Sequence, residues 1–174
     1  FTVPITYDGG TQTTSPNGDT LTLQGGGTFA DATFGFNNTS DGDIDITGNA
    51  MISYAGLEPI SSTITITNVT LNYGTAAETI TVTDATGGQT TVTSTAGETI
   101  TFDDPTGTLT INAGNTNDDI VTIASLAASF PGNVTIDGEG GSDTVNVDGA
   151  ISLSVNKNVS LTAEAININS DITL

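Results

Sequence analysis

The residues best suited to chemistry are aspartates in two acidic turns that occupy the same place in two similar stretches. The stretches 107–131 and 132–156 repeat one another with a spacing of 25 residues (143 − 118 for the aspartates), within the range typical of stacked repeats. The aligned positions are Gly107 with Gly132, Leu109 with Val134, Ile111 with Ile136, Asp118 with Asp143, and Ile120 with Val145. If the stretches stack, Asp118 and Asp143 lie about 4.8 Å apart, and a cation would remove their repulsion. The alternative is a solvated turn that tolerates both charges.

We therefore expect a cation site at these turns, and further acidic residues extend the list of candidates. The candidate ligands at the two turns are Asp118, Asp119, Asp137 and Asp143. Asp103 and Asp104, which precede Pro105, are a lesser candidate pair. Asp41 and Asp43, with Asp45, form another, although Asx-turn formation also explains both of these lesser groups.

The charge of the chain favours cations as partners. There are 20 acidic residues against one basic residue and no His, which gives a net charge of −19. Such a chain repels nucleic acid and anionic membrane surfaces. No apolar run approaches the ~20 residues of a membrane span, and the absence of Cys excludes disulfides and thiolate chemistry. The first residue is Phe1 rather than Met, as expected of a processed or excised piece of a longer protein.

The hydrophobic pattern predicts an all-β fold. Apolar and polar residues alternate almost throughout, and no stretch has helical spacing. The second repeat contains three pairs of inward apolar residues, Val134/Ile136, Val145/Val147 and Ile151/Leu153. The last stretch repeats them, without the acidic turn, as Val159/Leu161, Ile166/Ile168 and Ile172/Leu174. Three short strands per repeat predict a right-handed parallel β-helix, a β-solenoid of triangular cross-section.

The chain divides into four sections on this pattern. Residues 1–40 are expected to form capping or edge strands, and 41–61 a first coil with Ile44/Ile46 and Ile52/Tyr54 inward. Residues 62–102 read as inserted antiparallel strands, with a β-hairpin formed by 79–84 and 90–93. A continuous stack of irregular coils is the alternative for this section. Residues 103–174 are the regular coils.

One acidic turn resembles a known calcium-binding repeat. The nonapeptide 138–146 (GEGGSDTVN) is similar to the G-G-x-G-x-D-x-U-x motif of RTX-type secreted bacterial proteins, although Glu139 replaces the second Gly. The resemblance implies calcium as the cation, which takes ~6–8 oxygen ligands that Gly-rich backbone and Asp can supply. The family combines ligands from consecutive coils of an 18-residue repeat, whereas here each coil offers one such turn.

A second resemblance suggests the biological role. The segments 54–60 (YAGLEPI) and 100–111 (ITFDDPTGTLTI), followed by the acidic turn, resemble a repeat of very large bacterial surface adhesins over about residues 41–147. Residues 151–174 also resemble filamentous-haemagglutinin-type parallel β-helices. These resemblances imply a structural or adhesive building block of a secreted or cell-surface protein or filament. The expected partners are neighbouring copies or further repeats that stack on the open solenoid ends, together with surface glycans.

Two other classes of function compete with this expectation. Polysaccharide-cleaving enzymes use parallel β-helices, but their sites need a basic partner or an aromatic groove, and here Lys157 is the only basic residue and Trp is absent. We therefore expect no enzyme activity. A carbohydrate-binding module would need Tyr7, Tyr54 or Tyr73 to form a platform, and these residues are scattered along the chain.

Overall fold

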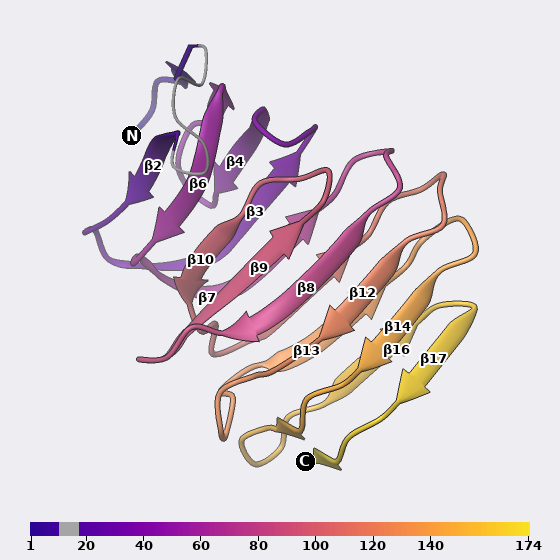
Figure 1. Cartoon of the computed structure of the whole chain (residues 1–174). Coiled ribbons are helices and arrows are strands. Elements are labelled where there is room, and N and C mark those ends of the chain that lie inside the picture. The colour runs from indigo at the N-terminus through magenta and orange to yellow at the C-terminus, as the bar shows by residue number, and fades with distance from the viewer. Residues whose placement is uncertain (11–17) are drawn as a thin grey trace.

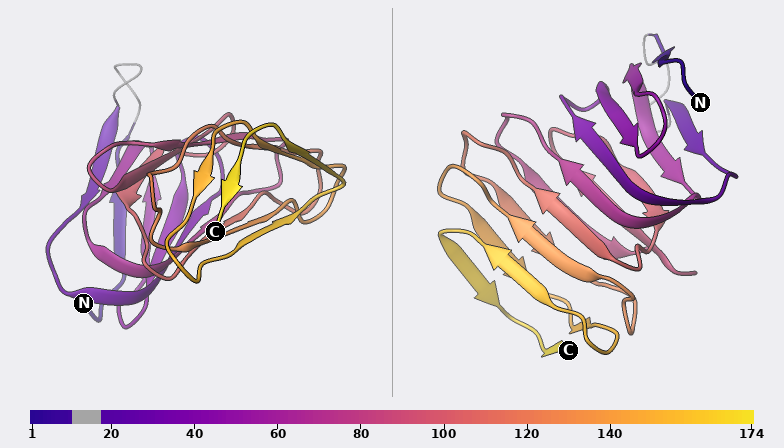
Figure 2. Two further views of the ribbon diagram at one scale, coloured as in Figure 1. Left: turned by 90° about the horizontal axis from the view of Figure 1, so that it is seen from below. Right: turned by 180° about the vertical axis from the view of Figure 1, so that it is seen from behind.

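The chain is all-β, as the alternation of apolar and polar residues predicted. The computed structural model describes residues 1–10 and 18–174, so residues 11–17 of the predicted N-terminal section lie outside the described residues. The described residues form 18 strands and no helix, and hence no helix that could cross a membrane. Sixteen of the strands belong to two eight-stranded sheets. Figure 1 and the right-hand view of Figure 2 show the molecule from opposite sides.

The first sheet runs from one end of the molecule to the other and begins with a strand near the N-terminus. Its strands, in spatial order, are β1 (Ile5–Asp8), β5 (Ile52–Ala55), β4 (Gly42–Ile46), β3 (Thr28–Phe36), β7 (Thr65–Asn72), β11 (Thr108–Asn112), β13 (Asn133–Asp137) and β16 (Val159–Thr162). Neighbours pair in parallel except where β4 lies between β3 and β5.

The strands of the second sheet also follow one another from the N-terminal end of the molecule to the C-terminal end. Its strands, from the N-terminal end, are β2 (Asp19–Leu23), β6 (Leu57–Ser62), β10 (Ile100–Asp103), β9 (Gln89–Ser94), β8 (Thr79–Asp84), β12 (Ile120–Ile123), β14 (Thr144–Val147) and β17 (Ala165–Ile168). Only β9 runs antiparallel to its neighbours. A third, two-stranded sheet pairs β15 (Ile151–Ser152) in parallel with β18 (Ile172–Thr173).

The core consists of the inward side chains of the two sheets. Along β11 and β13 burial alternates, with Leu109, Ile111, Val134 and Ile136 buried and their Thr and Asn neighbours half-buried. The predicted pairs of the last two repeats meet in register, because Val134 pairs with Val159, Val145 with Ile166, and Ile151 with Ile172. Each strand therefore contributes its apolar pair to a continuous column of side chains.

Within residues 1–10 and 18–174, antiparallel pairing occurs in two places, of which the sequence predicted one. The hairpin of β8 and β9 is confirmed. β7, inside the section 62–102, pairs in parallel on both sides, so antiparallel pairing in that section is limited to β9 and its two neighbours. In 41–61 the expected inward residues are buried, but β4 runs antiparallel to β3 and β5. The short turn from β4 to β5, with Gly48 at a φ of 84°, accounts for this, since short connections join antiparallel neighbours.

Candidate functional site

A row of acidic side chains lies at one end of the second sheet, where its parallel strands begin. Glu78, Asp119, Asp143 and Glu164 each stand directly before a strand, namely β8, β12, β14 and β17. The N–H of Glu78 donates to Asp119 Oδ1 (2.7 Å), that of Asp119 to Asp143 Oδ1 (2.9 Å), and that of Asp143 to Glu164 Oε2 (2.8 Å). We call these four residues the acidic ladder. The carboxylates of Asp119, Asp143 and Glu164 thus each accept the N–H of the ladder residue on the neighbouring strand, whereas that of Glu78 accepts from the Ser94 hydroxyl.

The ladder corrects the predicted alignment of the two acidic turns. Leu109 pairs with Val134 at a spacing of 25 (134 − 109), but Val121 pairs with Val145 at a spacing of 24 (145 − 121). The expected match of Ile120 with Val145 is therefore wrong, and Ile120 faces Thr144 with its side chain 42% exposed. The structural counterpart of Asp143 is Asp119 rather than Asp118.

Asp118 has a different part in the turn. It is exposed, and its Oδ1 accepts the N–H of Ser142 in the next acidic turn (2.9 Å). The contact still joins the two turns, as the aligned spacing suggested. Asp118 itself, however, is exposed and lies outside the buried row.

Burial makes the ladder electrostatically costly. Glu78, Asp119 and Asp143 are 3%, 1% and 2% exposed. Desolvation raises the pKa of Asp119, the N–H of Glu78 opposes that shift, and the charge of Asp143 adds to it. Desolvation also raises the pKa of Glu78, opposed by the Ser94 hydroxyl that donates to it and reinforced by Asp119. A proton or a cation therefore stabilises the buried ladder.

Two carboxylate oxygens of the ladder are the atoms to which such a proton or cation would bind. Asp119 Oδ2 and Asp143 Oδ2 are buried and have no hydrogen-bond partner. Their Oδ1 atoms are the ones that accept backbone N–H groups. Each of these two aspartates is thus half satisfied, which leaves one acceptor per residue for a proton or an ion.

The glycines of the second acidic turn are required by the ladder. A Cβ on Gly138 would lie 2.6 Å from Asp143 Oδ2, so a side chain there would displace the carboxylate. Gly141 has a φ of 150°, and a Cβ on it would lie 2.0 Å from the carbonyl oxygen of Asn117. The resemblance to a Gly-rich calcium-binding turn therefore rests on residues that also serve close packing against the neighbouring turn.

The remaining predicted ligands have hydrogen-bond partners outside the ladder. Asp137 Oδ1 accepts the N–H of Glu139 (3.0 Å), which is an Asx turn within the loop from β13 to β14. Asp103 is the last residue of β10 and Asp104 follows it, so both lie at the opposite end of the second sheet's strands. Asp103 Oδ1 accepts from Gln89 Nε2 (2.8 Å), and Asp104 Oδ1 from Thr90 Oγ1 (2.7 Å).

The predicted group around Asp41 is also held by local hydrogen bonds. Asp41 accepts from Asn38 Nδ2 (2.9 Å) and from the N–H of Gly56 (3.0 Å), and these bonds lower its pKa. Within residues 1–10 and 18–174, no group of three or more acidic residues lies close enough together to hold a metal ion by itself.

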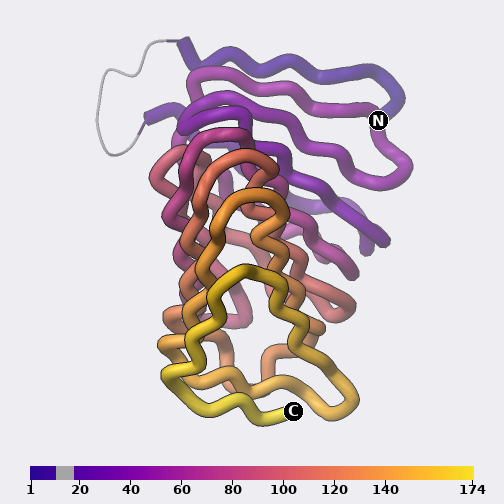
Figure 3. The backbone as a smooth tube through the Cα atoms, turned by 90° about the vertical axis from the view of Figure 1, so that its right-hand side faces the viewer, coloured from indigo at the N-terminus to yellow at the C-terminus, as the bar shows by residue number. Residues whose placement is uncertain are grey.

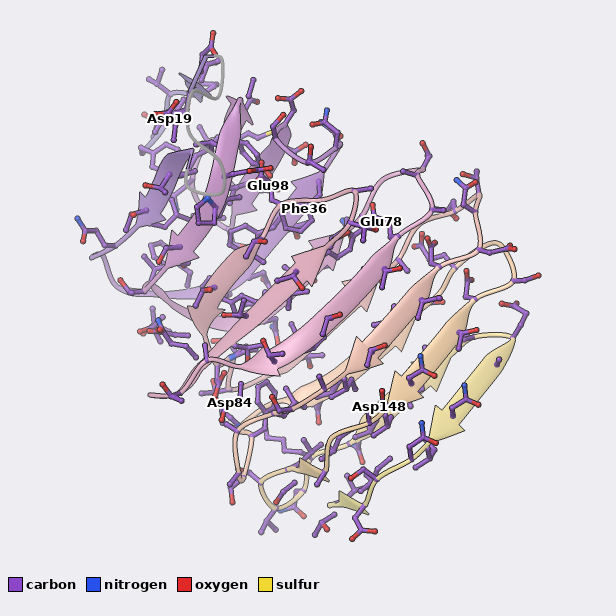
Figure 4. All side chains as sticks on the ribbon, in the orientation of Figure 1. Asp19, Phe36, Glu78, Asp84, Glu98 and Asp148 are labelled. Atoms are coloured by element: carbon purple, nitrogen blue, oxygen red, sulfur yellow. The ribbon has the colours of Figure 1, made fainter. Side chains whose placement is uncertain are left out.

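Sequence reasoning missed Glu98, the most strongly perturbed carboxyl group at this end of the sheet. Glu98 is fully buried, and neither of its carboxylate oxygens has a hydrogen-bond partner. Burial, together with the charges of Glu58 and Asp41, raises its pKa to about 8. Figure 4 shows Glu98 and Glu78 at the same end of the second sheet, with Asp84 and Asp148 at the other. Glu98 is therefore protonated over much of the neutral pH range.

A simple spacing in the sequence identifies all of these positions. Each acid stands two residues before the first inward residue of a strand in the second sheet. The pairs are Glu78 with Ile80, Glu98 with Ile100, Asp119 with Val121, Asp143 with Val145, and Glu164 with Ile166. The similarity between 78–81 and 98–101 is visible in the sequence, but its meaning depends on knowing which face of each strand is buried.

Comparison with family models, with curated proteins and with solved structures found no match for this chain.

The burial of Glu98 predicts a specific dependence of stability on pH. Because its pKa rises from 4.5 to about 8 on folding, the folded chain holds a proton that the unfolded chain releases between these values. The free energy of unfolding should therefore fall as the pH rises from 4.5 to 8 and then level off. In Glu98→Gln this fall should be smaller, as measured by urea denaturation across that range. Glu139→Gln, at an exposed position, is the control, and equal slopes in wild type and Glu98→Gln would contradict the assignment.

Proposed function

We propose that the chain is a structural building block of a bacterial surface or extracellular protein, folded as a right-handed parallel β-helix with three short strands per coil. The observation that carries the proposal is the pairing of consecutive strand triplets. β13, β14 and β15 pair in parallel, one for one, with β16, β17 and β18. A chain that visits three sheets in the same order in successive repeats is wound as a coil.

The stack has the form that a spacer needs. Each large sheet holds eight strands, which at about 4.8 Å per strand gives a length of roughly 40 Å. The two chain ends lie at opposite ends of the stack (Figure 3). A module of this kind, placed within a longer secreted protein, would hold the parts before and after it apart. The resemblance to repeats of very large surface adhesins supports the same role.

Both ends of the stack suit interfaces with neighbouring copies or further repeats. At the C-terminal end the inward residues Ile166 and Ile168 are 43% and 51% exposed, because no strand covers β17 on that side in the described chain. At the N-terminal end Ile5 is 44% exposed. Along each column of stacked apolar side chains, the positions inside the stack are thus buried, and the equivalent positions at its two ends are exposed.

Distance measurements within one molecule test the spacer role. The chain has no Cys, so Thr22→Cys on β2 and Asn167→Cys on β17 would place two spin labels at outward positions on the outermost strands. In dilute solution at 0.15 M NaCl, we expect a single narrow distance of roughly 35 Å by double electron–electron resonance. A broad or multiple distribution would contradict a stiff module.

We further propose that calcium stabilises the stack at the acidic ladder. The buried, unpartnered oxygens of Asp119 and Asp143 and the net charge of −19 support this. Calcium needs ~6–8 oxygen ligands, so backbone and water oxygens would have to complete the shell beside these two carboxylates. The proposal therefore concerns a partial donor set, and Asp103, Asp104 and Asp137 have no part in it.

Thermal unfolding tests the calcium proposal. The melting temperature of the wild type should be higher in calcium than in chelator by several degrees, because a ligand that binds only the folded chain stabilises it. The Asp119→Ala/Asp143→Ala variant should lose this difference, whereas Asp118→Ala should keep it. Equal melting temperatures of the wild type in calcium and in chelator would exclude calcium, and an equal shift in magnesium would indicate general charge screening.

A further inference from the structure

We propose that a second copy of this chain docks head to tail, so that its β1 pairs with β16 and its β2 pairs with β17, each in parallel. The inference rests on the proposed building-block role and names the partner of the open end. We call β1 and β2 the head, and β16 and β17 the tail. These four strands are the outermost strands of the two large sheets.

The strand directions allow both sheets to continue across such a contact. In the first sheet β1 is parallel to β5, and the two antiparallel steps at β4 cancel, so β1 runs in the same direction as β16. In the second sheet the two antiparallel steps at β9 cancel in the same way, so β2 runs in the same direction as β17. The parallel pairing that joins neighbouring coils can therefore be repeated between molecules.

The acidic ladder determines the register in which β2 of one copy would pair with β17 of the other. Asp19 stands two residues before Leu21, as Glu164 stands two residues before Ile166. With Leu21 opposite Ile166 and Leu23 opposite Ile168, Asp19 of the second copy occupies the next position of the acidic ladder. There its carboxylate can accept the N–H of Glu164, for which the described chain offers no acceptor. Glu164 is exposed, whereas the three preceding ladder residues are buried, so one more strand would complete the pattern.

The first sheet and the cavity at the head support the same docking. Ile5 and Tyr7 point to the same side of β1 as Ile52 and Tyr54 do on β5, so they can face Val159 and Leu161 of the tail. Between the head strands lies an open, mainly apolar cavity of about 350 Å³, lined by Ile5, Tyr7, Leu21, Leu23 and Phe29 among others. Exposed apolar side chains of a tail, such as Ile168 and Leu174, are of the kind that fills such a space.

Charge determines the conditions under which this contact forms. Each copy carries a net charge of −19, and the contact brings Asp19 close to Glu164. Repulsion between copies is screened as salt rises, since the Debye length falls from about 8 Å at 0.15 M to about 3 Å at 1 M. A head-to-tail contact does not close on itself unless its rotation forms a ring, so repeated docking produces a filament.

Disulfide trapping between two singly substituted chains tests the contact. A chain carrying Thr22→Cys on β2 is mixed with a chain carrying Asn167→Cys on β17 in 1 M NaCl and oxidised gently. The register places these outward residues opposite one another, within the 4.4–6.8 Å Cα separation that a disulfide spans. The control replaces the second chain by Thr122→Cys, a matched outward position two strands inside the sheet. On a non-reducing gel, we expect several times more mixed dimer from Thr22→Cys with Asn167→Cys than from Thr22→Cys with Thr122→Cys.

A blocking variant strengthens the test. Ile168→Lys, added to the Asn167→Cys chain, places a charge on the inward face of the tail at a residue that is already half exposed. It should abolish the mixed dimer, whereas Asn169→Lys in the same chain should not. Mixed dimer at only the level of the Thr122→Cys control would overturn the proposed docking. A narrow spin-label distance within single chains would then leave the building-block role standing, whereas a broad one would remove both.

Discussion

The structure depends on one constraint, which is that each strand must match its neighbour in register so that apolar pairs stack and backbone N–H groups meet acceptors. Val69, Leu109, Val134 and Val159 form one such column across the first sheet. A slip of one residue in any strand would turn its apolar pair outward. The loops can vary in length because only the strand positions are fixed, which is why the acidic turn between β13 and β14 is longer than the connection between β16 and β17.

The acidic ladder extends this register beyond the ends of the strands. The carboxylates of Asp119, Asp143 and Glu164 accept the N–H of the preceding ladder residue, so the backbone remains hydrogen-bonded where the chain enters the second sheet. The same arrangement buries like charges in a row, and burial raises the pKa of Glu78 and Asp119. The stability of the stack therefore depends on pH and on cations. Asn or Ser at the ladder positions would not produce this dependence.

Much of the fold could be predicted from the sequence, because alternation and spacing report which residues face inward. The pairs Val145/Ile166 and Ile151/Ile172 were correctly matched. The connection from β13 to β14 is one residue shorter than that from β11 to β12, and this difference was not predicted. The adjacent aspartates Asp118 and Asp119 make both alignments plausible when only the sequence is compared. The strand register, the burial of Asp119 and the exposure of Ile120 distinguish the two alignments.

The antiparallel course of β4 and the importance of Glu98 could not be predicted for a related reason. Ile44 and Ile46 alternate in the same way whether the strand runs parallel or antiparallel, so the pattern does not report direction. The spacing of Glu98 before Ile100 is visible in the sequence, but its raised pKa comes from burial and from the charges of Glu58 and Asp41, which are distant in sequence. Properties that depend on which strands become neighbours cannot be predicted from a short stretch of sequence.

Amide hydrogen exchange, measured residue by residue by NMR in dilute solution, tests the central claim most directly. The amides of Glu78, Asp119 and Asp143 donate to the next carboxylate of the ladder, whereas no described acceptor faces that of Glu164. The structure predicts slow exchange at the first three amides and fast exchange at Glu164. Exchange at Asp119 as fast as at Glu164 would contradict the ladder and the register on which it depends.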